Sequence, residues 1–143
     1  FGTGSGRPEQ IYPADSDILS KTTKDGGKDR LENGNYILTV HQNYVIIVGE
    51  DGSAETALIS MSASQGKIAR KWQSLQMSQT MTDAQGSFTP ASFANSYRLT
   101  SVLNSGKGNQ WYGFSVALEG AVKNATIYQR AKEFHDSMDK QNR

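Results

Sequence analysis

Apolar positions along this chain recur with two different periods, and each period predicts a different kind of element. From Asn35 onward, the stretch NYILTVHQNYVIIV is rich in β-branched and aromatic residues, which favour β-strands. Its length indicates one bent strand, or two strands that break at residues 41–43. The segment ETALISMS is predicted as the next strand, and Asp51-Gly52 before it is a strong hairpin signal.

A second pair of strands is predicted in NSYRLTSVL and QWYGFSVAL, which are joined by the glycine-containing loop NSGKGN. Side chains alternate between the two faces of a strand. In QWYGFSVAL this alternation separates Tyr112, Phe114, Val116 and Leu118 from Trp111 and Gly113. In NSYRLTSVL it separates Tyr97, Leu99 and Leu103 from Arg98, Thr100 and Val102. If the first group of each strand faces the core, Trp111 and Arg98 lie on the outer surface of one hairpin.

The helical period of 3.6 residues predicts two helices, near residues 64–80 and 125–138. The first has Ser62 or Ser64 as its N-cap, and its apolar stripe contains Ile68, Trp72, Leu75 and Gln79. The apolar side of the second contains Ile127, Ala131 and Phe134. Residues 1–34 are rich in Gly, Pro, Asp and Lys and have little periodicity, which indicates an extended arm with room for a short turn of helix at residues 15–21. The β-rich domain is therefore expected to span residues 35–143.

The order of these elements is strands, helix, hairpin, helix, and it predicts a mainly β fold with two helices. Three or more strands followed by a helix and two more strands is the order of an OB-fold barrel, in which the helix closes one end. We therefore expect a small, OB-like antiparallel barrel. An α+β sheet with both helices packed on one face fits the same order, and the pattern alone leaves both architectures open.

Composition narrows the functions that this chain can have. Its 143 residues are enough for one domain with its own core. The net charge of +1 excludes a general polyelectrolyte role, so any attraction to nucleic acid must come from local placement of cations. The absence of cysteine excludes disulfides and thiolate chemistry. No apolar run approaches the roughly 20 residues of a membrane helix, so we expect no membrane partner.

Two places combine cations with an aromatic side chain, as nucleic-acid contacts require. The first predicted helix carries Lys67, Arg70 and Lys71; its Trp72 shares the apolar stripe and is expected in the core, which leaves the three cations as a surface patch. The second is the later hairpin, with Trp111 and Arg98 on its outer surface and Lys107 at its tip. Alternatively, Trp111 packs under the C-terminal helix, and then offers no stacking platform.

The sequence contains no catalytic motif. His41 and His135 are the only histidines and lie on different predicted elements, and no nucleophile elbow occurs. The acids Glu50, Asp51 and Glu55 surround a hairpin turn, where solvated side chains are expected rather than cation ligands. We therefore expect a protein without enzymatic activity, without a metal and without a cofactor.

The run ALISMSASQGKIARKWQSLQM, followed by YRLTSV and KGNQWYGF, resembles a family of small proteins from tailed bacteriophages. The shared order is an apolar strand, a helix with the pattern [ST]-x-x-K-x-x-[RK]-x-W, a loop with proline, a YRL strand and a KG-x-[WF]-[FY] hairpin. The resemblance covers roughly residues 15–138. It implies that more sequence, including one or more strands, precedes Phe1 in full-length relatives.

Some members of that family are assigned to single-stranded DNA binding in phage replication or recombination. The resemblance thus implies a single-stranded DNA partner. We further expect self-association and contact with phage replication proteins, in the cytoplasm of the bacterial host or, alternatively, in the virion. One departure is the end FHDSMDKQNR, which is mixed in charge where phage single-stranded DNA-binding proteins often have an acidic tail. The alternative is a virion structural or assembly protein that uses its N-terminal arm for subunit contacts.

Overall fold

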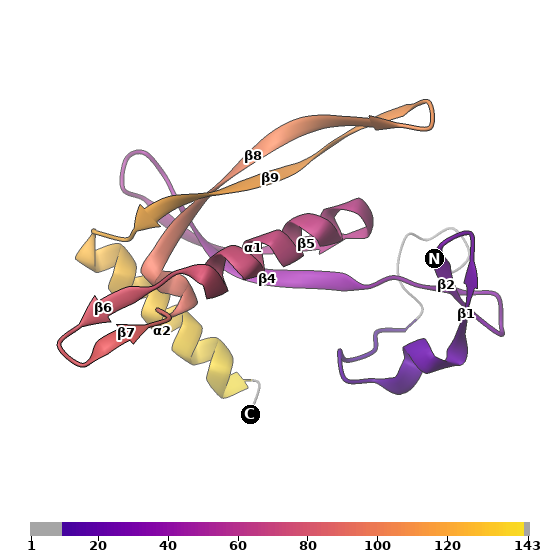
Figure 1. Ribbon diagram of the computed structural model, residues 1–143, viewed down its shortest axis with the longest axis horizontal. Helices are drawn as coiled ribbons and strands as arrows, with labels where there is room; N and C mark the ends of the chain where they lie inside the picture. The colour runs from indigo at the N-terminus through magenta and orange to yellow at the C-terminus, as the bar shows by residue number, and fades with distance from the viewer. Residues whose placement is uncertain (1–9, 142–143) are drawn as a thin grey trace. The chain divides into compact units, whose positions relative to one another are not determined.

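The computed structural model describes residues 10–141, so the first nine residues of the predicted arm lie outside the described residues. The chain divides into two compact units, Phe1–Val40 and His41–Arg143 (Figure 1). The boundary that we predicted between arm and domain, at residues 34 and 35, stays a prediction. The two units are described separately below.

The first unit contains a short 3₁₀ helix, η1 (Asp17–Lys21), and a small antiparallel sheet. Its strands are β1 (Thr22–Asp25), β2 (Lys28–Leu31) and β3 (Tyr36–Ile37), in that spatial order. Gly26 and Gly27 form the two-residue turn between β1 and β2, with φ angles of 57° and 82°. Such a turn needs positive φ at both positions, which glycine adopts without steric cost. The 3₁₀ helix η1 lies where the arm was expected to have a short turn of helix, whereas the small sheet occurs where we expected extended chain.

The second unit contains three hairpins and both α-helices (Figure 1). The first hairpin pairs β4 (Val40–Val48) with β5 (Ala54–Ser62), and η2 (Ala63–Gln65) leads into helix α1 (Gly66–Ser78). The second pairs β6 (Met81–Asp83) with β7 (Gly86–Phe88), and η3 (Ser92–Ala94) follows. The third pairs the long strands β8 (Asn95–Gly106) and β9 (Asn109–Ala121), and helix α2 (Ala125–Gln141) ends the described chain.

The sequence located the turns of the two larger hairpins correctly. Between β4 and β5, Gly52 has φ 80°, and the Asp51 carboxylate accepts a hydrogen bond of 3.0 Å from the Ser53 N–H. Between β8 and β9, Lys107 and Gly108 form a two-residue turn with φ angles of 48° and 78°. Positive φ is uncommon for a residue other than glycine, so Lys107 holds a backbone conformation that asparagine or glycine adopts more easily.

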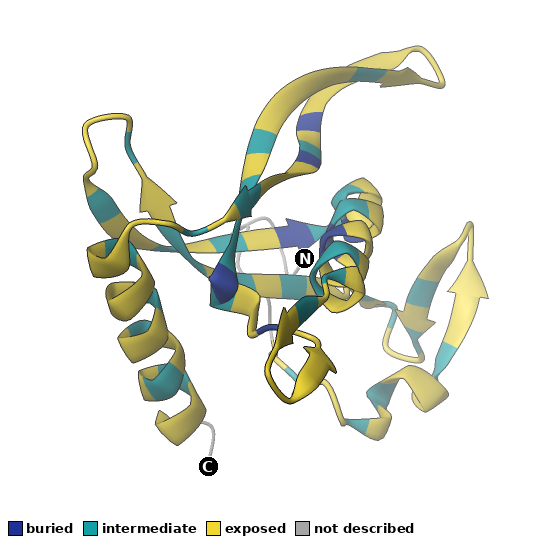
Figure 2. Cartoon of the chain, turned by 60° about the vertical axis from the view of Figure 1, so that its left-hand side comes forward, coloured by how far each residue is buried: buried dark blue, intermediate teal, exposed yellow. Residues whose placement is uncertain are grey.

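The core lies in the second unit, where α1 meets β5 and the β8–β9 hairpin. Its buried members are Met61, Ala69, Trp72 and Val116. Partly buried side chains surround them: Val45, Ile59, Ile68, Leu75, Tyr97 and Leu99. Burial is sparse along the ribbon in Figure 2. Only 7% of the surface of Trp72 is exposed to solvent, which confirms the prediction that it is a core residue.

Helix α2 is held by its cap and by aromatic contacts. Asn124 is the N-cap, and its side-chain oxygen accepts hydrogen bonds from the N–H groups of Thr126 and Ile127. Phe134 meets the ring of Tyr44 edge to face, with centroids 6.4 Å apart. On η3, Phe93 contacts two rings of α2, those of Tyr128 and His135.

The mainly β class with two helices is confirmed, but the predicted OB-like barrel is not found. The described strands form four separate sheets, one of three strands and three of two strands, and none of them closes. The alternative, one sheet with both helices on one face, is not found in residues 10–141 either. The reason is that β4–β5, β6–β7 and β8–β9 each pair with their neighbour in sequence, whereas a barrel requires pairing between hairpins.

Candidate functional site

Helix α1 presents its three cations on one side and buries the other. Ala69 and Trp72 point into the core. At 100° per residue, Lys67, Arg70 and Lys71 share an arc of about 100° on the opposite side. All three are exposed, and none forms an ion pair with a carboxylate of residues 10–141. The predicted basic patch on α1 is therefore accessible, and its role in binding nucleic acid stays a prediction.

A shallow polar cavity of about 280 Å³ lies between α1 and β4. Its lining is rich in side-chain amides: His41, Gln42, Asn43, Ala69, Gln73 and Gln76. Nearby, the Arg70 guanidinium and the His41 ring both lie within 4 Å of the position that a Cβ atom on Gly66 would take. These groups can donate and accept hydrogen bonds, so the cavity suits a polar ligand rather than an apolar one.

Trp72 cannot serve as a stacking platform, because the core encloses it. Its ring packs against Tyr97, with centroids 6.0 Å apart and an interplanar angle of 61°. Burial raises the pKa of the Tyr97 hydroxyl. The Trp72 Nε1–H is itself buried and has no hydrogen-bond acceptor among the described residues. An unpaired buried donor has a free-energy cost, so this indole is retained for its volume and contacts rather than for its polarity.

Strand register places Arg98 and Trp111 on the same face of the hairpin, as predicted, but not side by side. Arg98 pairs with Ala117, and Trp111 pairs with Asn104. Trp111 is six positions from Ala117, which corresponds to about 20 Å along a strand. Arg98 instead forms an ion pair with Glu119, whose carboxylate raises the pKa of the guanidinium. The expected pairing of a tryptophan with a neighbouring guanidinium is therefore wrong.

Trp111 lies near the tip of the hairpin and is 39% exposed. Its ring rests on Gly106: a Cβ atom at that position would lie 3.4 Å from the ring's Cη2. One ring face thus packs on backbone while part of the ring remains accessible to a ligand. Lys107, at the adjacent turn, is exposed as well. The hairpin tip therefore combines an aromatic ring with one cation.

The opposite face of the hairpin has a feature that sequence analysis missed. The alternation of side chains was right, since Tyr112 pairs with Leu103 and Phe114 pairs with Ser101 on the predicted apolar face. Only the base of that face is covered by the core. Farther along, Leu103, Tyr112 and Phe114 are 55%, 74% and 37% exposed.

The same hairpin carries almost no charge. Between Leu99 and Leu118, Lys107 is the only charged residue. That run of uncharged residues is visible in the sequence, and it is the signal from which the exposed apolar face could have been predicted. Long exposed β-structure usually carries charged side chains that prevent unwanted association.

A family model of the Pam3 phage gp34-like protein matches residues 4–143. The chain belongs to this family. The match confirms a phage protein, as the resemblance implied, and gives no support to the assignment to single-stranded DNA binding. No curated protein and no solved structure matches the chain.

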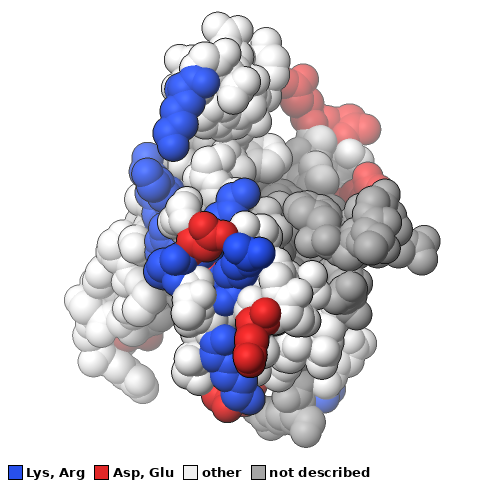
Figure 3. Space-filling model, turned by 90° about the vertical axis from the view of Figure 1, so that its right-hand side faces the viewer, with Lys and Arg blue, Asp and Glu red and all other residues white. Residues whose placement is uncertain are grey.

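The described part of this gp34-like chain contains no group of three or more His, Asp or Glu side chains that could hold a metal ion. No described helix is long and apolar enough to cross a membrane. Figure 3 shows acidic side chains among basic ones on one face, with uncharged areas between them. With a net charge of +1, any attraction for nucleic acid must come from local placement of cations.

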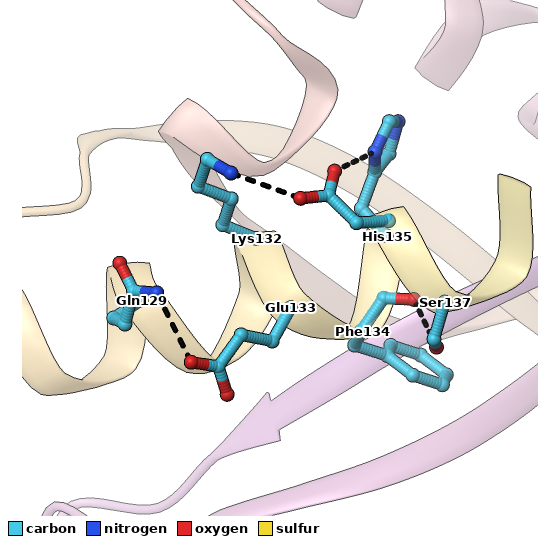
Figure 4. A network of polar contacts seen from close by, with 7 residues as sticks. Gln129, Lys132, Glu133, Phe134, His135 and Ser137 are labelled. Carbon is cyan, nitrogen blue, oxygen red and sulfur yellow. Dashed lines mark hydrogen bonds and ion pairs between the residues drawn. The ribbon is translucent and has the colours of Figure 1, made fainter. Parts of the chain in front are cut away.

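Several polar contacts link side chains along α2 of this gp34-like chain (Figure 4). Lys132 Nζ lies 2.9 Å from the Asp136 carboxylate, and His135 Nδ1 lies 3.4 Å from it. These two neighbours hold the pKa of Asp136 below its usual value, and Asp136 in turn raises the pKa of Lys132. All three side chains are about half exposed, so the contribution of this cluster to helix stability is expected to be small.

Proposed function

We propose that this member of the Pam3 phage gp34-like family is a structural or assembly component of the phage particle. The observation that carries this proposal is the β8–β9 hairpin, whose apolar face extends beyond the core and exposes Leu103, Tyr112 and Phe114. An isolated two-stranded sheet has little stability in water, and a large exposed apolar patch marks a surface that another protein covers.

Burial of this apolar face against another protein is energetically favourable. Complete burial of a large apolar side chain contributes about 1.5–3 kcal/mol. Covering the exposed parts of Leu103, Tyr112 and Phe114 would therefore supply several kcal/mol. That is enough to help hold subunits together, since each 1.4 kcal/mol changes an equilibrium constant tenfold.

The first unit is compatible with the same role. None of the buried hydrophobic residues lies in residues 10–40, and the exposed apolar side chains there include Ile11, Leu19, Tyr36 and Leu38. A segment that buries so little of its own surface gains stability when it lies on a neighbouring subunit. This supports the predicted use of the N-terminal region for subunit contacts.

The test is to look for the protein in purified particles and in assembly intermediates of the phage that encodes it. We expect it there in a fixed ratio to the major structural proteins. Replacing Tyr112 by Ser in the phage genome should reduce the yield of complete particles, while Thr100→Ser, on the other face of β8, should leave it unchanged. Absence of the protein from both particles and intermediates, with normal assembly after gene deletion, would overturn the proposal.

A second candidate function is binding of single-stranded nucleic acid in the host cytoplasm, with phage replication proteins as partners. Two observations favour it: the unpaired cations of α1 and the accessible Trp111 ring beside Lys107. Cations contact phosphates, and an exposed aromatic ring stacks on bases. Neither candidate function requires a catalytic residue, a metal or a cofactor, and we propose a non-enzymatic protein.

Titration of a labelled oligonucleotide at two salt concentrations tests the second candidate. Each phosphate contact contributes about 0.7 to the salt slope for single strands, so Lys67→Ala/Arg70→Ala/Lys71→Ala should lower the slope by about two units. The matched control is Lys123→Ala/Arg130→Ala/Lys140→Ala, which removes the same charge near and along α2. Equal affinity and slope for the wild type and both triple variants would leave the α1 cations as a solvated helix face.

A further inference from the structure

The hydrogen bonding of β9 shows which backbone groups of the hairpin point outward. The Phe114 N–H donates to the Gln65 side-chain oxygen at 2.8 Å, so it does not bond to β8. Phe114 and Ser101 are therefore a non-hydrogen-bonded pair of the ladder. Such pairs alternate with hydrogen-bonded ones in antiparallel sheets. It follows that the backbone N–H and C=O groups of Ser101, Leu103 and Ser105 point away from β9, along the outer edge of β8.

This outer edge of β8 lacks the usual protection against strand pairing. Residues 99–106, LTSVLNSG, contain no charged residue and no proline, and the one bulge of the hairpin lies earlier, between Ser96 and Tyr97. Within residues 10–141, β9 is the only strand that pairs with β8. Natural edge strands are normally short, charged, bulged or covered. An edge without these features is suited to pairing with another strand.

The outer edge of β9 is different, because Gln65, the last residue of η2, bonds to it at Phe114. Besides bonding to Phe114, the Gln65 side chain crowds Gly113, where a Cβ atom would clash with Gln65 Nε2. Gly113 is buried accordingly. The chain itself thus occupies the outer edge of β9 at Phe114, whereas no described strand pairs with the outer edge of β8.

We propose that the outer edge of β8 pairs antiparallel with the same edge of a second copy of this chain, about a two-fold axis near Val102. The inference rests on the proposed assembly role. Because the chain itself occupies part of the β9 edge at Phe114, the β8 edge is the one that each copy offers, and pairing of two such edges is an isologous contact. The product is a four-stranded sheet in the order β9, β8, β8, β9.

A second copy supplies the additional strands that the two-stranded hairpin lacks. Four strands with a common apolar face meet the requirement for a stable sheet, which two strands do not. The pairing also places Leu103, Tyr112 and Phe114 of the two copies on one continuous face. The two-fold axis puts the Lys107 side chains at opposite ends, roughly 30 Å apart, so their charges do not oppose pairing.

Cysteine substitution tests the contact directly, because the chain contains no cysteine of its own. Ser101→Cys, Val102→Cys and Leu103→Cys each place a single thiol near the proposed axis. A residue on the axis faces its own copy at a distance that a disulfide can span. We expect a covalent dimer under mild oxidation for at least one of the three, and none for the control Gln110→Cys on β9.

Sedimentation velocity over a range of protein concentrations provides the second measurement. A single strand pair buries less than about 1,200 Å², so the dimer should dissociate on dilution. Ser101→Pro removes an outward N–H but no ladder bond, and it should weaken the dimer at least tenfold. Gln110→Pro makes the matching change on β9 and should leave the dimer intact. If Ser101→Pro does not fold by circular dichroism, Ser101→Lys gives the same test without altering the backbone.

The inference is overturned if the wild type stays monomeric at the highest concentration and no cysteine variant cross-links. It is also overturned if both Ser101 variants dimerise like the wild type. The proposed function fails by a different result, namely absence from particles and intermediates. A monomer that is found in particles would contradict only the two-fold pairing, and a dimer that is absent from them would contradict only the assembly role.

Discussion

Trp72 combines a large buried surface with a buried N–H that has no acceptor among the described residues. Trp72→Ala should lower the free energy of unfolding by about 3–5 kcal/mol, as truncation of a buried aromatic does. Trp72→Phe should cost much less, because phenylalanine keeps most ring contacts and removes a donor whose desolvation costs about 1–3 kcal/mol. Urea unfolding followed by circular dichroism measures both.

Trp111→Ala is the matched control, because this ring is 39% exposed and rests on Gly106 rather than in the core. Trp111→Ala should lower the free energy of unfolding by less than Trp72→Ala does. If Trp72→Phe destabilises as strongly as Trp72→Ala, the indole N–H has a partner in solution and the argument from polarity fails.

Helix α2 offers a test of pH dependence, because Lys132 and His135 both lie beside the Asp136 carboxylate (Figure 4). They lower the pKa of Asp136 from its ordinary value of 3.8. A lowered pKa in the folded state means that the stabilisation is complete above about pH 4 and is lost as the pH falls through the lowered pKa. Asp136→Asn should therefore flatten the loss of thermal stability between about pH 4 and pH 2.

Asp139→Asn is the control for this prediction, since Asp139 forms no ion pair with any described residue of α2 or elsewhere. Midpoints of thermal unfolding at several pH values compare the two variants with the wild type. The effect is small because the cluster is half exposed and salt screens it. Identical acid profiles for the wild type and Asp136→Asn would mean that the cluster does not stabilise α2.

Local elements could be predicted from sequence because their signals are local. The stripe of Ile68, Trp72 and Leu75 predicted a helix near residues 64–80, where α1 spans Gly66–Ser78, and Asp51-Gly52 located the turn between β4 and β5. Whether the strands close into a barrel could not be predicted. Closure depends on pairing between strands far apart in sequence, and hydrophobic periodicity does not give the register of such pairs.

The β8–β9 hairpin shows a second limit of prediction from the alternation of apolar residues. Alternation correctly grouped Tyr112, Phe114 and Val116 on one face, but only Val116 is buried. A face that packs on its own chain and a face that packs on a neighbour have the same alternation, so periodicity does not distinguish core from interface. Of the predicted binding residues, Lys67, Arg70 and Lys71 lie together, whereas Arg98 is paired with Glu119 and distant from Trp111.

The two units differ in what stabilises them. All five buried hydrophobic residues of the described chain lie in residues 41–143. The described part of the first unit instead contains three exposed or half-exposed ion pairs: Lys21–Asp17, Lys24–Asp29 and Arg30–Asp25. Exposed pairs of this kind contribute little and weaken as salt rises, whereas a hydrophobic core does not depend on screening. The second unit should therefore fold without the first.

A chain of residues 40–143, which retains all of β4, tests this expectation. Its midpoint and slope of urea unfolding should stay close to those of the whole chain, because the buried residues and both tryptophans are retained. Trp fluorescence and circular dichroism follow the transition. A chain of residues 1–40 is the complement and should show no cooperative transition at any salt concentration, since a segment without a buried core rarely folds alone. Loss of the cooperative transition from residues 40–143 would instead show that the core around Trp72 depends on the first unit.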